Sequence, residues 1–199
     1  MARSDRIRTD LHVLIRNLDE RCRTSIAAAP DPSKPPTQWT AVLFLVRTQH
    51  FLTPLEQVSE VLEMPRDITR VPGTKPWLVG VANNRGVLLP IFHLATFMEQ
   101  TQQQPSPPHT EFNHERRREG RSRERVLVIR QDELPCGLIV SEAIGMRSIQ
   151  FNTRTTVVPD GFGACQPYID ASFLFDGAPV PVIRLARLIT DPLFQAANG

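Results

Sequence analysis

The stretch VGVANNRGVLLPIFHLATFM, residues 79–98, is repeated in outline by DASFLFDGAPVPVIRLARLI, residues 170–189. At an offset of 91 positions, a glycine, a proline and a Leu-Ala pair coincide, and most of the apolar positions between them stay apolar. The main difference is a charge, because Arg85 in the first stretch aligns with Asp176 in the second. The coinciding pairs are Gly86 with Gly177, Pro90 with Pro181, Leu94 with Leu185 and Ala95 with Ala186.

Each stretch predicts a β-hairpin followed by a short helical segment. Gly86 and Gly177 provide the positive φ that a tight turn at NNRG or FDGA requires. Pro90 and Pro181 interrupt the return strands and lack an amide donor, so we expect these strands at a sheet edge or a bulge. The LATFM and LARLI segments each predict a helical turn that closes one end of a barrel.

The repetition extends upstream of the hairpins. VLFLVR (42–47) leads to VSEVLEM (58–64), and VLVIR (126–130) leads to VSEAIGM (140–146). Because the two elements recur in the same order, we interpret the chain as an internal duplication. Its period of about 85–90 residues exceeds that of solenoid repeats and is typical of a small barrel built from short strands.

The composition shifts divide the chain into five segments. The first pairs an amphipathic helix, with apolar residues at Leu11, Leu14 and Leu18, with a proline-rich linker. We expect that helix either to pack on the first barrel or to dock to a partner helix. The middle segment is rich in Gln, Pro and Arg and predicts a disordered linker. The segments are the arm and linker 1–37, the first half 38–98 (barrel 1 elements), the linker 99–124, the second half 125–190 (barrel 2 elements) and the C-terminal tail 191–199.

The charge and cysteine content restrict the compartment and the partners. The net charge of +2 is contained in the segment between Glu111 and Arg125, with six arginines and four glutamates, so the rest of the chain is neutral. A basic surface for nucleic acid is therefore not expected, although the arginine run could meet an anionic partner. Three widely spaced cysteines form no disulfide framework, and no signal peptide or membrane span is apparent. These features predict a cytoplasmic protein.

Catalytic motifs are missing from the sequence. It contains no Walker loop, no G-x-G-x-x-G, no G-x-S-x-G and no paired metal ligands. His109 and His114 lie in the proline-rich linker, where no scaffold would hold a zinc ion with three or four ligands. We therefore expect a protein without catalytic activity, cofactor or metal.

Residues 38–190 resemble the CheW family of chemotaxis adaptors. The resemblance rests on LTPLEQVSEVLEMP, on PWLVGVANNRGVLLPIFHLATFM and on RVLVIRQDELPCGLIVSEAIGM, which occur in the family's order. The N-terminal helix and the GVANNRG wording are most similar to the PilI branch, which serves the type IV pilus pathway of twitching motility. The resemblance implies a mainly β fold of two SH3-like five-stranded barrels with a groove between them. It also implies a non-catalytic scaffold in membrane-associated arrays, which couples the cytoplasmic tips of methyl-accepting receptors to a CheA-type histidine kinase.

The resemblance also implies a docking site. The family's turn arginine, here Arg85, pairs with the glutamate of the V-x-E motif, here Glu60, where receptor and kinase dock. Asn83 and Asn84 precede this arginine, and Asn84 departs from the aliphatic residue that is usual in the family. The remaining predicted positions are the receptor-groove residues Val58 and Leu127 and the conformational residues Gly86, Gly137, Gly177, Pro90 and Pro181.

Two alternative functions remain open at this stage. The first is a flagellar-chemotaxis CheW, and the second is a small barrel that binds RNA or DNA. Nucleic-acid-binding barrels place aromatic platforms over a basic groove. This chain has one tyrosine and two tryptophans and a neutral body, which disfavours the second alternative.

Overall fold

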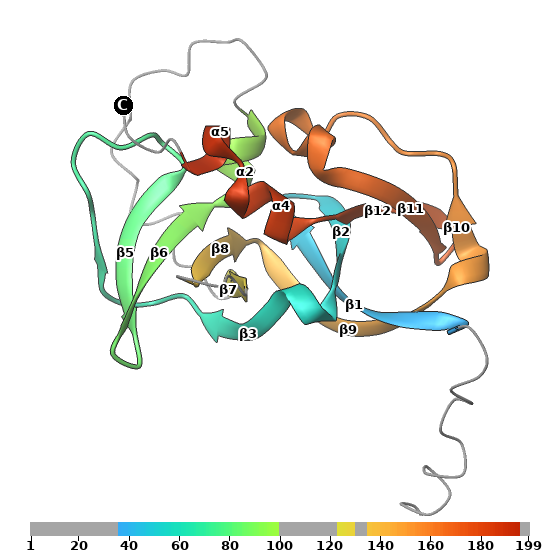
Figure 1. Cartoon of the computed structure of the whole chain (residues 1–199), viewed down its shortest axis with the longest axis horizontal. Helices are drawn as coiled ribbons and strands as arrows, with labels where there is room; N and C mark the ends of the chain where they lie inside the picture. Colours follow the sequence, from blue (N-terminus) through green and yellow to red (C-terminus); the bar gives the residue numbers. More distant parts are fainter. Residues whose placement is uncertain (1–35, 100–122, 130–134, 196–199) are drawn as a thin grey trace, which may run out of the picture. The chain divides into compact units, whose positions relative to one another are not determined.

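The computed structural model of the chain describes residues 36–99, 123–129 and 135–195, and their fold is mainly β (Figure 1). The strands form two six-stranded sheets, which we call sheet A and sheet B. In each sheet one strand is only two residues long, which leaves five longer strands. In sheet order, sheet A consists of β10 (Arg154–Thr155), β11 (Ile169–Phe175), β12 (Ala178–Ile183), β2 (Gln49–Pro54), β1 (Gln38–Val46) and β9 (Glu142–Gln150).

Sheet B repeats this arrangement with the other copy of each strand. Its middle pair, β6 with β8, is parallel, as is the β12–β2 pair of sheet A. The other pairs in both sheets are antiparallel. In sheet order, sheet B consists of β3 (Val58–Glu63), β7 (Arg125–Ile129), β8 (Cys136–Val140), β6 (Val87–His93), β5 (Leu78–Asn84) and β4 (Ile68–Thr69).

The two sequence halves do not each form one sheet, which corrects our assignment of barrel 1 to residues 38–98 and barrel 2 to 125–190. Sheet A combines β1 and β2 of the first half with β9–β12 of the second, and sheet B combines β3–β6 with β7 and β8. Each strand of sheet B has its duplicate in sheet A, with a strand number that differs by six. Read from β4, the order of sheet B is β4-β5-β6-β8-β7-β3, which matches β10-β11-β12-β2-β1-β9 in sheet A. The duplicated halves have therefore exchanged their first strand pairs.

The two hairpins have the tight turns that their sequences indicate. Gly86 and Gly177 have φ values of 87° and 81°, and the residues before them also have positive φ. Of our two alternatives for the return strand, an edge or a bulge, the edge is wrong, because β6 lies between β5 and β8. The pairing of β6 with β5 does shift register, between Leu78 and Gly80. Pro90 faces Val81 of β5, and the pairing with β8 begins only at Ile91. The proline thus occupies a part of the strand that has one neighbour.

The second hairpin uses the same solution. Pro181 faces Ser172 of β11, and the pairing of β12 with β2 involves Val182. In a two-residue hairpin the facing pairs alternate between hydrogen-bonded and non-hydrogen-bonded, counted from the pair that closes the turn. Both prolines fall on non-hydrogen-bonded pairs, so the missing proline amide removes no hydrogen bond between the two strands of either hairpin.

Three apolar clusters fill the structure. One is confined to sheet A and includes Leu43 and Phe173, and one is confined to sheet B and includes Leu89 and Val126. The largest, which we call the shared core, takes residues from both sheets, among them Phe44 and other side chains of β1, β7 and β8. Alternate residues of β1 therefore enter different clusters, which explains its uninterrupted apolar sequence.

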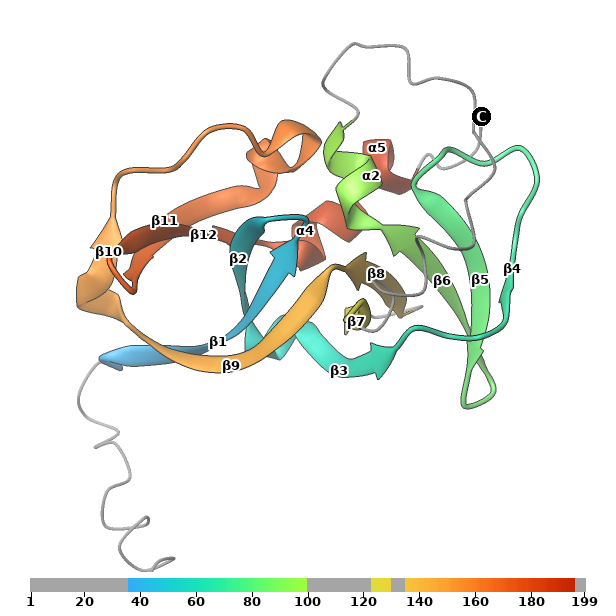
Figure 2. The same ribbon diagram turned by 180° about the vertical axis from the view of Figure 1, so that it is seen from behind.

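The helical segments pack on the shared core. The helices α2 (Leu94–Met98), α4 (Leu185–Thr190) and α5 (Pro192–Gln195) lie together between the sheets (Figures 1 and 2). His93 caps α2, because its Nδ1 accepts a hydrogen bond of 3.2 Å from the Thr96 amide. The α5 helix corrects our description of 191–199 as a tail, since the Phe194 side chain in it is only 1% exposed.

The turn of 3₁₀ helix η4 (Gly163–Tyr168) also depends on a close approach of two backbone segments. Gly163 has a φ of 51°, and a Cβ atom built on it would overlap the backbone carbonyl of Met98, the last residue of α2. A glycine is therefore needed here both for its conformation and for its lack of a side chain.

The two buried cysteines make stability sensitive to alkaline pH. Burial raises the pKa of the Cys136 and Cys165 thiols from 9.0 to about 12. Because their pKa is higher in the folded state, the resulting stability is complete below pH 9 and is lost as the pH rises toward 12. We expect the free energy of unfolding to fall by about 1.4 kcal/mol per pH unit and thiol above pH 9.

Urea unfolding at pH 8, 9 and 10 measures this loss. Cys22 lies outside the described residues and is replaced by serine throughout. With Cys165→Ala, the free energy of unfolding should fall less steeply between pH 9 and 10, because only one of the two buried thiols still contributes to the pH dependence. An unchanged slope would contradict the assignment to the buried thiols.

Candidate docking site

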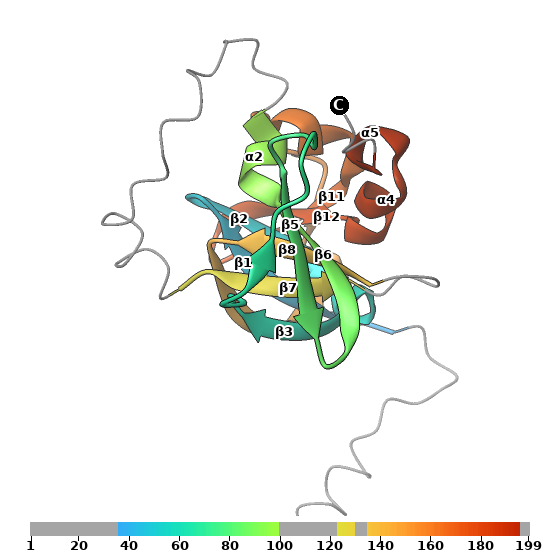
Figure 3. The same ribbon diagram turned by 90° about the vertical axis from the view of Figure 1, so that its left-hand side faces the viewer.

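The β5–β6 hairpin presents an arginine at its turn. Arg85 and Gly86 occupy the two central positions with φ values of 52° and 87°, which is the pattern of a type I′ turn. The Oδ1 atom of Asn83 accepts a hydrogen bond of 2.7 Å from the Gly86 amide and closes the turn. The turn end of this hairpin points away from the helices (Figures 1 and 3).

Glu60 on the edge strand β3, which is not paired with β5 or β6, connects to this turn through its side chain. Its Oε1 accepts a hydrogen bond of 2.7 Å from Asn84 Nδ2, and its Oε2 lies 3.3 Å from Arg85 Nη2. The Arg85 side chain is 80% exposed and that of Glu60 is 27% exposed. The structure thus brings together the predicted residues Glu60, Asn84 and Arg85, and Asn84 holds the carboxylate that pairs with the arginine.

Exposed apolar residues neighbour the members of this ion pair in the sequence. Val61 follows Glu60 on β3 and is 46% exposed, while Val87 and Leu88 follow the turn and are 47% and 67% exposed. An exposed ion pair beside aliphatic groups suits protein–protein contact, because a guanidinium gives direction and the apolar groups give area. We call Glu60, Val61, Asn83, Asn84, Arg85, Val87 and Leu88 the hairpin surface.

Val58 and Leu127 do not belong to an exposed groove, which corrects our expectation. Val58 is 7% exposed and Leu127 is fully buried, and both contribute to the shared core. The physical reason is that β3 and β7 pair antiparallel with these residues on the face that meets the core. Their apolar character serves packing.

Gly137 lies at the centre of sheet B. It is paired with Val128 of β7 on one side and with Ile91 of β6 on the other. A Cβ atom on it would approach Ile91 Cδ1 to 2.7 Å and Val126 Cγ1 to 2.9 Å. The missing side chain thus leaves room for the sheet B cluster.

Sheet A contains the duplicate of the turn with the opposite charge. Asp176 and Gly177 have φ values of 50° and 81°, close to those of Arg85 and Gly86. The β9 duplicate of Glu60 is Glu142, which lies 3.9 Å from Arg123 in a long ion pair. The two turns therefore have similar backbone conformations but carry side chains of opposite charge.

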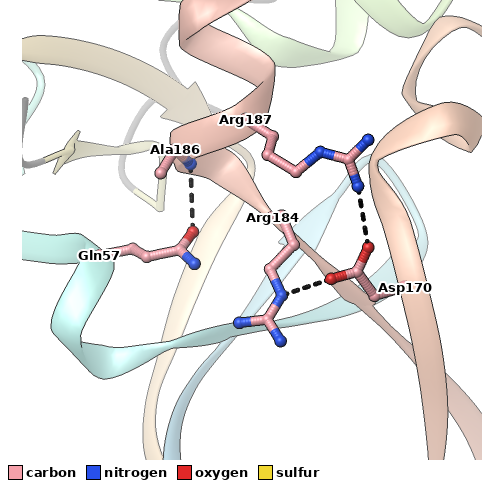
Figure 4. A network of polar contacts seen from close by, with 5 residues as sticks. All are labelled: Gln57, Asp170, Arg184, Ala186 and Arg187. Atoms are coloured by element: carbon pink, nitrogen blue, oxygen red, sulfur yellow. Dashed lines mark hydrogen bonds and ion pairs between the residues drawn. The ribbon is translucent and has the colours of Figure 1, made fainter.

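A polar network at the base of the second hairpin was not anticipated from the sequence (Figure 4). Asp170 Oδ2 lies 2.6 Å from Arg184 Nε, and its Oδ1 lies 3.2 Å from Arg187 Nη1. Gln57 Oε1 accepts a hydrogen bond of 3.1 Å from the Ala186 amide at the start of α4. The offset of 91 positions could have revealed this network, since it aligns the arginines with the His93–Thr96 cap of α2.

Replacing Arg85 by asparagine tests whether the arginine serves stability. We expect a change of no more than about 0.5 kcal/mol in the free energy of unfolding, because Asn-Gly favours a type I′ turn and offsets the loss of an exposed ion pair. Denaturant unfolding measures the change, and Asp176→Asn is the matched control in a turn without this ion pair. A loss above about 2 kcal/mol would make Arg85 a structural residue.

The described ranges contain neither a metal-binding cluster nor a membrane-spanning helix. No group of three His, Cys, Asp or Glu side chains there could hold a metal ion. No helix among those residues is long and apolar enough to cross a membrane. The N-terminal arm, most of the 99–124 linker and its histidines lie outside the described residues.

Comparisons with known proteins agree with this architecture. The family model for the CheW-like domain matches residues 40–193. Protein PilI of Pseudomonas aeruginosa is 34% identical over 167 residues, which cover 84% of each chain. The crystal structure of the scaffolding protein TtCheW from Thermoanaerobacter tengcongensis superposes with a TM-score of 0.58 at 18% identity, covering 78% of this chain and 90% of that one. The chain therefore belongs to the CheW-like family of scaffold adaptors in chemotaxis-type signalling.

Proposed function

We propose that this protein is a non-catalytic adaptor in a type IV pilus chemosensory pathway. It couples the cytoplasmic tips of methyl-accepting receptors to a CheA-type histidine kinase and is recruited from the cytoplasm to membrane-associated arrays. The observation that carries the pathway assignment is the 34% identity to PilI across 84% of both chains. The family membership supports the adaptor role.

The hairpin surface is the proposed docking site for these partners. Arg85 has a backbone conformation that is uncommon for residues other than glycine, asparagine and aspartate. An exposed ion pair adds only about 0–1 kcal/mol to stability, which is a weak structural reason for an arginine there. A role in recognition accounts better for an exposed arginine that pairs with Glu60 on a hairpin that also carries the exposed residues Val87 and Leu88.

A pull-down from lysate of the native host tests the proposal. The wild type is compared with Arg85→Asp, which places at the turn a residue that the duplicate turn already accommodates at Asp176. The matched control is Asp176→Arg, which reverses a charge in the same backbone conformation. We expect a CheA-type kinase and a methyl-accepting receptor, identified by mass spectrometry, to be recovered with wild type and control and to be lost at least tenfold with Arg85→Asp.

The possible results separate function from site. Equal recovery of both partners with Arg85→Asp would retain the adaptor function and remove the hairpin surface as the docking site. Loss only with the control would move docking to sheet A. Recovery of neither partner with the wild type would contradict the adaptor function itself.

A deletion strain tests the pathway. Loss of twitching with intact swimming is the expected result for a pilus adaptor. Loss of swimming with intact twitching would instead indicate a flagellar CheW.

A further inference from the structure

Sheet B contains a cavity of about 330 Å³ that the docking function does not use. The loop between β4 and β5 forms one wall, and Ile139 of β8, which is 2% exposed, contributes a recessed apolar surface. The cavity lies at the Leu78 end of β5, whereas Arg85 follows its other end. The lining residues are Met64, Arg70, Val71, Thr74, Lys75, Pro76, Leu78, Val79, His93, Thr96, Glu124 and Ile139.

The charges in this cavity are unbalanced. Arg70 and Lys75 are both exposed cations in the lining, and among the described residues neither forms an ion pair. The lining holds one acid, Glu124. The apolar part of the wall therefore adjoins a net positive charge without an acidic partner in contact.

The duplicated cavity in sheet A provides an internal comparison. It measures about 300 Å³, and its lining includes Asp170 and Arg184, which are the duplicates of Val79 and His93. There the arginine is bound by Asp170 at 2.6 Å, so its charge is compensated. In sheet B this pair is replaced by Val79 and His93, and the cations of the lining, Arg70 and Lys75, come from the loop between β4 and β5. The two cavities thus share a position in the fold but differ in formal charge. The sheet A lining is neutral, with Glu56 and Asp170 against Arg154 and Arg184, whereas the sheet B lining has two cations and one acid.

We propose that the sheet B cavity binds a small organic anion, namely a molecule with an apolar body and one acidic head group. Ligand pockets are typically about 300–1,000 Å³ and mostly apolar with a few placed polar groups. The body would contact Leu78, Val79 and Ile139, and the head group would meet Arg70 and Lys75. An anion with an aromatic or aliphatic body can contact the apolar residues and the cations of the lining at the same time.

Titration with 1-anilinonaphthalene-8-sulfonate tests this site. The readout is the set of ¹H–¹³C methyl resonances of the full chain, in which Val71, Leu78, Val79 and Ile139 report on this cavity and Val182 on the one in sheet A. We expect saturable shifts confined to the first set. N-phenyl-1-naphthylamine, which has the same body without the sulfonate, should bind at least tenfold more weakly.

Charge-reversal variants test the role of the two cations. Arg70→Glu combined with Lys75→Glu should weaken sulfonate binding at least tenfold, while leaving binding of the neutral compound within about twofold. The matched control is Arg66→Glu, which changes an exposed arginine outside the lining and should bind as wild type. An unperturbed methyl spectrum without ligand verifies that each variant folds.

Three results would overturn the proposal. They are shifts centred on Val182, equal affinity for both compounds, or equal sulfonate affinity of the double variant and the wild type. The outcome is independent of the adaptor function, because recovery of kinase and receptor is measured on Arg85 variants with Arg70 and Lys75 unchanged.

Discussion

Replacing Phe194 with alanine is expected to lower the free energy of unfolding by about 3–5 kcal/mol, the usual cost of removing a buried aromatic ring. The Phe194 ring is 1% exposed and lies 4.6 Å from the ring of Phe92 and 5.0 Å from that of Phe97, measured between centroids. Its backbone carbonyl also accepts a hydrogen bond of 3.2 Å from Trp77 Nε1. The α5 helix therefore joins the shared core through one side chain.

The neighbouring Leu193 provides the control for Phe194→Ala. It belongs to the same short helix but is 74% exposed, so Leu193→Ala should change stability by no more than about 0.5 kcal/mol. Urea unfolding followed by circular dichroism measures both variants. Similar values for the two would mean that α5 does not contribute to the core.

A Gly163→Ala variant is expected to lose about 3 kcal/mol or more, through overpacking against a backbone segment that cannot move independently. A Cβ atom on Gly163 overlaps the carbonyl of Met98, and its φ of 51° adds the strain of a left-handed conformation. Relief would require α2 and η4 to separate. These two segments come from different halves of the chain, so we expect their packing to be disrupted.

Gly161 separates the steric effect from the conformational one. It lies two residues before η4 begins, with a φ of 98°, and a Cβ atom on it would meet no atom within 4 Å. Gly161→Ala should therefore show only the conformational cost, about 1 kcal/mol. Thermal unfolding of both variants distinguishes the two effects, and equal losses would exclude the clash with Met98.

The sequence was sufficient to predict the duplication, the hairpins and the mainly β fold, because turn glycines and apolar spacing are local signals. The exchange of strand pairs was not predictable in the same way. The apolar run of β1 shows that both faces are buried, but it does not specify whether β1 lies beside β3 or β9. Pairing with β9 depends on how the two halves pack, because the Phe44 side chain lies in the shared core and the Leu43 side chain lies in the apolar cluster of sheet A.

The candidate site was predictable to a similar degree. A charged residue in a glycine turn is visible in the sequence, and the resemblance to CheW pointed to Glu60 as the partner of Arg85. Whether Val58 and Leu127 line a groove or fill a core cannot be read from an aliphatic residue on a strand, because burial depends on the opposing element. Phe194 and Gly163 were missed because neither belongs to the repeated pattern.

The exchange of strand pairs also has a consequence for how the chain folds. The side chains of Gln38 and Gln150 meet across 112 positions in the β1–β9 pair, so sheet A cannot form until most of the chain has been synthesised. Such distant pairings slow folding, because a large loop must close before its contacts stabilise it. Neither half should fold by itself, and a chain cut within residues 99–124 should regain its structure only when both fragments are present together.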